Sequence, residues 1–138
     1  MDELQILELM EAIQILERKL TMSLVDSGLR IPQYRVLNIL NEFGSSTVSD
    51  LSKRLRITRA ATSLLINEML KNEYVNTEEN KIDRRSFHII ISDIGREKLR
   101  IAQKSLNAAE TKLSRFLNED VVTNLNKFSK HIIDGEKN

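Results

Sequence analysis

Between Thr47 and Lys71 the sequence contains two short helical patterns separated by only about three residues, and this feature restricts the fold most strongly. The first pattern opens with Thr47-Val48-Ser49-Asp50, which resembles a capping box with Asp in place of the usual Glu or Gln. The second follows Thr58, whose hydroxyl can accept a hydrogen bond from a free N–H group of the first turn. Residues 56–58 join the two patterns without the glycine that is common in such turns. Two helices joined this tightly predict a helix-turn-helix.

The two sides of the second helix differ in chemistry. At 100° per residue, one side is apolar and can reach a core. The other side carries small, polar and basic residues, which can approach base edges and phosphates in a major groove about 12 Å wide. An ordinary amphipathic surface helix would show the same pattern, so this segment alone leaves both interpretations open. The predicted inner residues are Thr62, Leu65, Ile66 and Met69, and the predicted outer residues are Arg59, Ala60, Ser63, Leu64, Asn67 and Lys71.

A ribbon is predicted directly after the second helix. An extended segment begins at Tyr74-Val75, and the residues from Phe87 to Ile91 read as a return strand. The segment between them, from Glu78 to Arg85, is polar and ends in two adjacent arginines. Arginines near the tip of a ribbon can reach the minor groove or the DNA backbone beside a helix. The order of elements predicts a mainly α fold, a winged helix-turn-helix with a two- or three-stranded β-wing.

Five stretches of sequence together resemble the MarR family of bacterial and archaeal transcriptional regulators. They cover roughly residues 31–99 with the spacing intact, and the combination is specific although each stretch alone is weak. The resemblance implies a homodimeric winged-helix regulator that binds a pseudo-palindromic operator in double-stranded DNA and is often released by a small-molecule effector. The stretches are Ile31-Pro32-Gln33-Tyr34-Arg35-Val36-Leu37, Thr47-Val48-Ser49-Asp50-Leu51-Ser52-Lys53-Arg54-Leu55, Ile57-Thr58-Arg59-Ala60-Ala61, Asp83-Arg84-Arg85 and Gly95-Arg96.

The residues expected to bind DNA lie in the second helix and in the wing. Arg84 and Arg85 are expected at the minor groove or the backbone, and Asp83 is expected to orient one of them through a charge-assisted hydrogen bond. The resemblance implies an effector site between the dimer helices and the DNA-binding lobe, here near Tyr34, Arg35 and the first helix. No residue pattern identifies a ligand, and a structural role for Tyr34 and Arg35 is an equal alternative. The full predicted set is Thr58, Arg59, Ala60, Ser63, Leu64, Asn67, Lys81, Asp83, Arg84 and Arg85.

Several positions depart from the family's pattern. Leu64 and Glu68 stand where basic residues are common, and the loss of each cation lowers phosphate affinity through reduced counterion release. Leu70 is expected on the exposed side, and Asn80 replaces the first Asp of the wing pattern. Leu64 could instead contact a thymine methyl group. These departures favour an alternative function, a winged-helix protein-interaction module with weakened DNA binding.

The two ends of the chain are predicted to form a dimerisation region around one DNA-binding lobe. The whole of 1–138 is expected to be a single domain, with the lobe at about 30–100 and helical dimerisation segments at 1–29 and 101–138. A lone subunit would leave their apolar stripes exposed, which predicts a symmetric dimer with recognition helices about 34 Å apart. The stripes are Ile6, Leu7, Met10, Ile13, Leu16, Leu20 and Leu24; Leu99, Ala102, Leu106, Ala109, Leu113 and Phe116; and Val121, Val122, Leu125, Phe128 and Ile132.

Charge is divided unevenly along the chain. Residues 1–29 contain two basic and six acidic residues and residues 30–100 contain thirteen and nine, so the net charges are −4 and +4. An anionic partner would require positive charge in the lobe. No apolar run approaches the ~20 residues that span a bilayer, and the acidic start does not resemble a signal peptide, so a cytoplasmic protein without membrane contact is expected.

The sequence gives little support for catalysis. The chain contains no cysteine, which excludes disulfides and thiolate chemistry. His88 and His131 lie far apart in the sequence and outside any metal-ligand spacing, and no Gly-rich phosphate loop is present. We therefore expect no enzyme activity, no cofactor and no metal. We expect the regulator to be a repressor. Whether it represses or activates depends on where its operator lies, which the sequence does not encode.

Overall fold

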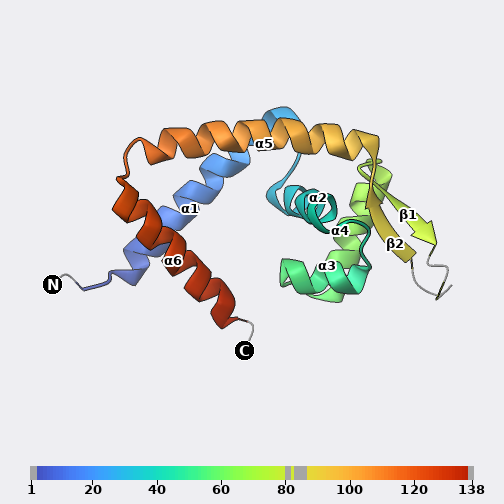
Figure 1. Cartoon of the computed structure of the whole chain (residues 1–138), viewed down its shortest axis with the longest axis horizontal. Helices are drawn as coiled ribbons and strands as arrows, with labels where there is room; N and C mark the ends of the chain where they lie inside the picture. Colours follow the sequence, from blue (N-terminus) through green and yellow to red (C-terminus); the bar gives the residue numbers. More distant parts are fainter. Residues whose placement is uncertain (1–2, 80–81, 83–86, 137–138) are drawn as a thin grey trace.

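The computed structural model describes residues 3–79, 82 and 87–136. Within these ranges the chain forms six α-helices, one short 3₁₀ helix and a two-stranded antiparallel sheet (Figure 1). This agrees with the predicted mainly α fold with a β-wing. The elements are α1 (Ile6–Ser23), η1 (Val25–Ser27), α2 (Ile31–Phe43), α3 (Val48–Leu55), α4 (Arg59–Lys71), β1 (Val75–Glu79), β2 (Phe87–Ile91), α5 (Asp93–Ser114) and α6 (Glu119–Gly135).

Polar side chains begin four of these helices, two of them at the predicted caps Thr47 and Thr58. Thr47 accepts a hydrogen bond from the Asp50 N–H group at 3.0 Å, and the Asp50 carboxylate accepts one from the Thr47 N–H group at 3.4 Å. The predicted capping box is therefore present. Thr58, Ser92 and Asn118 cap α4, α5 and α6 in the same way. Each cap satisfies an N–H group that has no partner within its helix.

One apolar core joins α2, α3, α4, the sheet and the first half of α5. Val36, Leu37, Leu51 and Met69 are completely buried in it, and Ala102 brings α5 onto the same cluster. Leu24 is also buried, so the segment at the end of α1 is anchored in this lobe. The inner faces predicted from helical periodicity therefore form the core.

The sheet is a hairpin attached to the lobe at its base. Val75 pairs with Ile91, and Glu79 pairs with Phe87 at the outer end. Ser46 adds an isolated bridge to Ile89, with both backbone hydrogen bonds formed at 3.0 and 2.7 Å. The wing is therefore a two-stranded sheet, and Ser46 alone pairs with it from a third segment of the chain. Ile89 is buried against the core and Phe87 is 55% exposed, so the hairpin extends away from the lobe.

A glycine lets α5 pass very close to the start of the wing. A Cβ atom built on Gly95 would lie 2.1 Å from the backbone oxygen of Tyr74. The Ser92 hydroxyl accepts from the Gly95 N–H group at 2.9 Å and donates to the Glu73 carbonyl at 2.6 Å. The Gly95 position of the MarR-like pattern is therefore a site where two backbones touch, and only glycine fits there without a shift.

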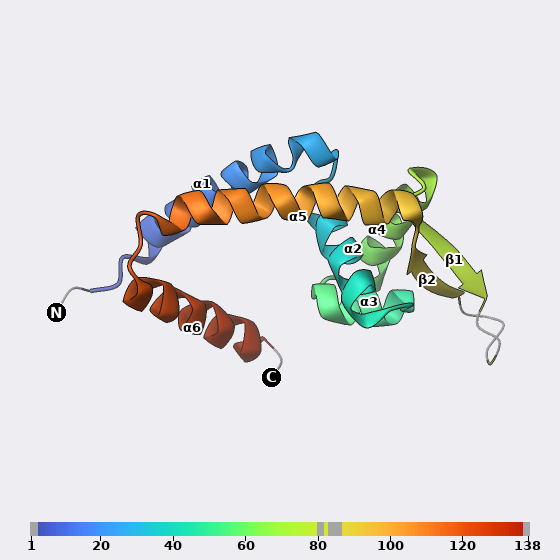
Figure 2. The same ribbon diagram turned by 45° about the horizontal axis from the view of Figure 1, so that its top comes forward.

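The helices at the two ends of the chain extend away from the lobe. α5 runs from the lobe toward α1 and α6, and both of these lie to one side of α2, α3 and α4 (Figure 2). Neither α1 nor α6 contains a buried residue. The predicted stripe on α5 is buried only at its start, with Leu99 and Ala102. It also ends earlier than predicted, because α5 stops at Ser114 and Phe116 is 86% exposed in the turn that follows.

Candidate nucleic-acid interface

α3 and α4 form a helix-turn-helix through residues 56–58. The turn is held by a hydrogen bond from the Ile57 N–H group to the Ser52 carbonyl at 3.3 Å. Arg56 adopts a left-handed backbone with φ 58°, so it takes the conformation that glycine provides in many such turns. Thr58 then accepts from the Ala61 N–H group at 3.1 Å and starts α4. The missing turn glycine is replaced by a residue with a strained backbone.

α4 has one buried side and one exposed side, as its sequence predicts. Thr62, Leu65, Ile66 and Met69 are buried. Thr62 also donates its hydroxyl hydrogen to the Thr58 carbonyl at 2.8 Å, which satisfies a polar group in the core. The core therefore fixes which residues α4 presents to solvent. Six predicted interface residues of this helix and its cap are all exposed: Thr58, Arg59, Ala60, Ser63, Leu64 and Asn67.

A groove of about 470 Å³ lies between α4, the start of α3 and the wing. Arg59, Ser63 and Asn67 line it from α4, and Thr47 and Ser49 line it from α3. Thr77 and Phe87 close it on the side of the hairpin. The three parts predicted to act together are thus neighbours. The arrangement puts hydroxyl, amide and guanidinium donors around one concave surface, the donor types that bind phosphates and base edges.

Two of the predicted departures have a different role from the one expected. Glu68 does not stand free beside the outer face, because Arg30 donates to both its carboxylate oxygens at 2.6 Å and Gln33 donates to one of them at 3.0 Å. Leu70 was expected on the exposed side, but it is half-buried and packs against the core. It also lines the groove beside the wing, so the expectation of an exposed side chain is wrong, although Leu70 still belongs to the concave surface. Leu64, at 73% exposed, is the departure that does face solvent.

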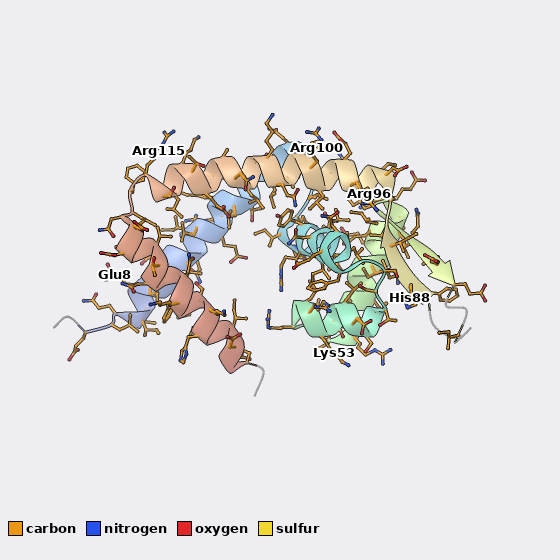
Figure 3. The ribbon with its side chains drawn as sticks, viewed as in Figure 1. Glu8, Lys53, His88, Arg96, Arg100 and Arg115 are labelled. Carbon is orange, nitrogen blue, oxygen red and sulfur yellow. The ribbon has the colours of Figure 1, made fainter. Side chains whose placement is uncertain are left out.

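Four of the predicted site residues come between β1 and β2 in the sequence. Lys81, Asp83, Arg84 and Arg85 are outside the described residues, as is Asn80. The two strands themselves contribute Thr77 and Phe87 to the lining of the groove. His88, in β2, is half-buried and pairs across the sheet with Glu78 (Figure 3).

A second concave surface, which we call the basic cleft, was not predicted from the sequence. It has a volume of about 690 Å³ and lies between α2 and the end of α3. Arg35, Lys53, Arg54 and Arg56 line it together with Tyr34 and Phe43. The Arg54 guanidinium lies 3.6 Å from the centroid of the Phe43 ring, a cation–π contact. The run Lys53-Arg54-Leu55-Arg56 was the available signal, but only the fold shows that it faces the aromatic residues of α2.

Tyr34 reaches this cleft from α2 with its hydroxyl protonated at neutral pH. Burial of the side chain raises its pKa above the ordinary value of 10.0, and the negative charge of Glu110 raises it further. Arg35, the next residue, donates to the Leu55 carbonyl at 3.3 Å and so links α2 to the end of α3. The effector expectation named these two residues together with the first helix; the basic cleft contains both residues, but no described residue of α1 lines it.

Within the described ranges, no group of three or more His, Cys, Asp or Glu side chains is placed to hold a metal ion. None of the helices in those ranges is both long and apolar enough to cross a membrane.

The fold and the groove define a winged helix-turn-helix protein. Residues 29–87 match the model of the MarR family, so this segment is a MarR-family domain and the resemblance read from the sequence is confirmed. A curated relative, the uncharacterized HTH-type transcriptional regulator YwhA from Bacillus subtilis, is 30% identical over 61 residues. That match spans 44% of this chain and 44% of the relative.

Solved structures of the same fold extend the likeness to nearly the whole chain. AbsC, a MarR family transcriptional regulator from Streptomyces coelicolor, has a TM-score of 0.81 at 24% identity, covering 93% of this chain and 88% of AbsC. The M. tuberculosis transcriptional regulator MOSR, solved in complex with DNA, has a TM-score of 0.70 at 19% identity, covering 94% and 98%. At these identities the likeness concerns the fold, and it includes the end helices as well as the lobe.

Proposed function

We propose that the protein is a sequence-specific DNA-binding transcriptional regulator that acts as a homodimer on a pseudo-palindromic operator. The observation that carries this proposal is the outer side of α4, where every predicted contact residue of the helix is exposed while the opposite side is locked in the core. MOSR, which shares the fold, was solved with DNA, and this supports the same partner here. Repression is the expected sign of regulation. The whole of 1–138 would act as one unit.

In this proposal α4 enters the major groove with its outer side, from Arg59 to Asn67. Arg59 and Asn67 would contact bases or phosphates, and Ser63 would donate its hydroxyl hydrogen between them. Thr58 and Ala60 are small enough to let the helix start approach the duplex closely. Lys81, Arg84 and Arg85 in the wing would add contacts to the minor groove or the backbone, with Asp83 orienting an arginine. These wing roles rest on the sequence alone.

Dimerisation is proposed from the apolar faces of the end helices. Leu7, Met10 and Ile13 on α1 are exposed in the single chain, as are Leu125, Phe128 and Ile132 on α6. Apolar surface of this extent on a subunit marks an interface with another chain. A two-fold symmetric pair would give two copies of α4, which suits a pseudo-palindromic operator with half-sites one helical turn apart.

We further propose that an effector of the regulator occupies the basic cleft. Four cationic side chains and two aromatic rings line it against one carboxylate residue, Glu136 at the end of α6, so the cations are in excess and a small organic anion with a planar ring fits its chemistry. Binding there would act on α2 and α3, which pack directly against α4. A shift of operator affinity in the presence of aromatic carboxylates, reduced in Arg35→Ala, would support this part.

The alternative, a protein-interaction module, has lost most of its basis. It was motivated by Leu64, Glu68 and Leu70, but Glu68 is neutralised by Arg30 and Leu70 packs against the core. Leu64 remains as a single exposed apolar residue on the outer side of α4. One exposed leucine is common on protein surfaces and does not define a protein interface.

A salt titration of binding to the DNA upstream of its own gene tests the proposal. Regulator function predicts affinity that falls steeply with salt, and Arg59→Ala should reduce the slope of log K against log[salt] by up to about one unit. Lys104→Ala is the matched control, because it removes an exposed cation on α5, and Figure 1 shows α5 on the other side of α2 from α3. The control should leave the slope unchanged. Absence of binding at low salt, together with a co-purifying protein partner, would instead support the interaction module.

A further inference from the structure

We propose that Arg30, Gln33 and Glu68 form a clamp that fixes the recognition helix α4 relative to the rest of the lobe, so that Glu68 contributes to operator discrimination without touching DNA. The role in discrimination rests on the proposed DNA-binding function. Glu68 is thereby assigned as a positioning residue. It stands at a position where the family commonly has a cation, and the sequence alone suggested that it weakens DNA binding.

The three side chains form a closed network of hydrogen bonds. Arg30 Nη2 donates to both oxygens of Glu68 at 2.6 Å, and Gln33 Nε2 donates to Glu68 Oε1 at 3.0 Å. Gln33 Oε1 in turn accepts from the Arg30 backbone N–H group at 3.0 Å. Gln33 is buried, with 3% of its surface exposed, so its amide can hold only one orientation without losing a partner. The network therefore has a rigid centre although its ion pair is partly exposed.

The clamp connects elements that are distant in the sequence. Arg30 precedes α2, and Glu68 lies 38 residues later in the third turn of α4, next to the predicted contact residue Asn67. A rotation of α4 about its axis would carry Glu68 away from Arg30 and Asn67 away from its place on the outer side. The core sets which side of α4 faces outward, and the network adds a restraint on the exact angle at which Arg59, Ser63 and Asn67 face a duplex.

Arg30 also lies in the segment that connects α1 and η1 to α2. The preceding segment is held by Ser27, which donates to the Leu24 carbonyl at 2.6 Å and accepts from the Leu29 N–H group at 3.1 Å. Leu24 and Leu29 are buried in the core. The path from the end of α1 to α4 thus runs through buried residues and a single polar network. The clamp ties the orientation of α4 to the segment that carries the end helices.

An exposed ion pair normally contributes little to stability, and the proposal does not require otherwise. The clamp has to restrain the direction of α4. The Glu68 carboxylate supplies this restraint because the Arg30 guanidinium and the buried Gln33 amide both hold it. Direct electrostatic repulsion between Glu68 and DNA would give a different pattern of affinities. Removing a negative charge near phosphates strengthens binding to all sequences alike, whereas loosening a helix weakens the specific complex more than the non-specific one.

The test measures the ratio of operator affinity to affinity for unrelated DNA of equal length. Glu68→Ala and Arg30→Ala should each lower this ratio by about tenfold, within the range that one good base contact provides. The double variant should be no worse than either single one, because both remove the same restraint. Glu68→Gln keeps an acceptor for Arg30 and Gln33 but removes the charge, so it should stay near the wild-type ratio. Glu97→Ala is the matched control, since Glu97 pairs with Arg100 on α5 at a similar exposure.

A measurement without DNA separates this inference from the proposed function. The chain has no cysteine, so spin labels can be attached at Asn41→Cys on α2 and Lys71→Cys on α4, both exposed, and labelled chains diluted with unlabelled ones. The α2 to α4 distance distribution should broaden in Glu68→Ala and remain narrow in Glu68→Gln. An unchanged distribution, or equal DNA-affinity gains in Glu68→Ala and Glu68→Gln with no change of ratio, would overturn the clamp. A broadened distribution in a protein that binds no operator would refute only the DNA-binding function.

Discussion

The lobe and the end helices of this chain differ in how far their apolar side chains are buried. In the lobe, side chains of α2, α3, α4, the sheet and α5 bury one another, and Val36, Leu37, Leu51 and Met69 have no measurable exposure. In α1 and α6 no residue is buried. The lobe completes its core within one chain, whereas the end helices need surface from elsewhere. The difference shows which part of the molecule buries its own apolar side chains, and it places the proposed dimer interface on the other part.

Charge separates the same two regions. Residues 1–29 carry a net charge of −4, and residues 30–100 carry +4. The lobe also concentrates cations locally, with Arg35, Lys53, Arg54 and Arg56 around one cleft. A region with apolar stripes and acidic character suits contact with another protein chain, and a positive region suits an anionic partner. Stability and assembly can therefore be tested separately from DNA binding.

The largest effect expected is the loss of the lobe's own packing in Gly95→Ala. The new methyl group would lie 2.1 Å from the Tyr74 backbone oxygen, so α5 must move away from the wing. We expect the free energy of unfolding to fall by about 3 kcal/mol, the upper end of the usual cost of overpacking. Urea titration at fixed protein concentration measures it.

The control for this substitution is Gly135→Ala at the end of α6, where an added Cβ meets nothing within 4 Å. It should leave stability unchanged or raise it by up to about 1 kcal/mol, because alanine favours the helix. Equal losses of stability in Gly95→Ala and Gly135→Ala would show that the close backbone contact at Gly95 does not determine stability. The contrast between the lobe and the end helices would then fail.

The second effect should separate subunits while leaving the lobe folded. Phe128→Glu puts a charge on the apolar face of α6, where the ring is 40% exposed in the single chain. If the partner covers that ring, a symmetric dimer loses two buried rings, each worth about 1.5–3 kcal/mol, so the dimer dissociation constant should rise at least about 100-fold. Sedimentation equilibrium measures the constant. Thr123→Glu, on the opposite face of α6, should dimerise normally, and a monomeric wild type would contradict the whole assignment of the end helices.

A third effect lies inside the lobe at the turn of the helix-turn-helix. Arg56 holds a left-handed backbone with φ 58°, which costs a non-glycine residue about 1–2 kcal/mol. Arg56→Gly should therefore raise the free energy of unfolding by about 0.5–1 kcal/mol, after allowing for the greater freedom of glycine in the unfolded chain. Arg56→Ala keeps the Cβ atom and should give no such gain. If Arg56→Ala stabilised equally, repulsion between the cations of the basic cleft would be the cause, not the backbone.

The features that the sequence predicted are those in which cause and effect lie within a few residues. Thr47 and Thr58 cap helices because each hydroxyl reaches an N–H group three residues ahead. The inner and outer sides of α4 follow from helical periodicity. The MarR-like motifs are likewise local patterns at fixed spacing.

The features that were missed depend on residues far apart in the chain. Glu68 is neutralised by Arg30, 38 residues away, and no local pattern contains that partner. Leu70 is covered by packing that exists only after folding, and the steric role of Gly95 depends on Tyr74 at the other end of the wing. The basic cleft joins α2 to the end of α3 in the same way. These features depend on tertiary contacts, which the periodicity of the sequence does not predict.

The smallest expected effect concerns Leu64, the exposed apolar residue on a surface otherwise suited to an anion. Leu64→Arg adds a cation on the outer side of α4, so affinity for unrelated DNA should rise several-fold and the salt slope should steepen by up to about 0.9. Leu64→Ala adds no charge and should leave non-specific binding as it is. A loss confined to the operator in Leu64→Ala would assign Leu64 to a thymine methyl contact, because only base readout depends on sequence. An unchanged slope in Leu64→Arg would mean that this side of α4 does not face the duplex, and the lobe's positive charge would then need another anionic partner.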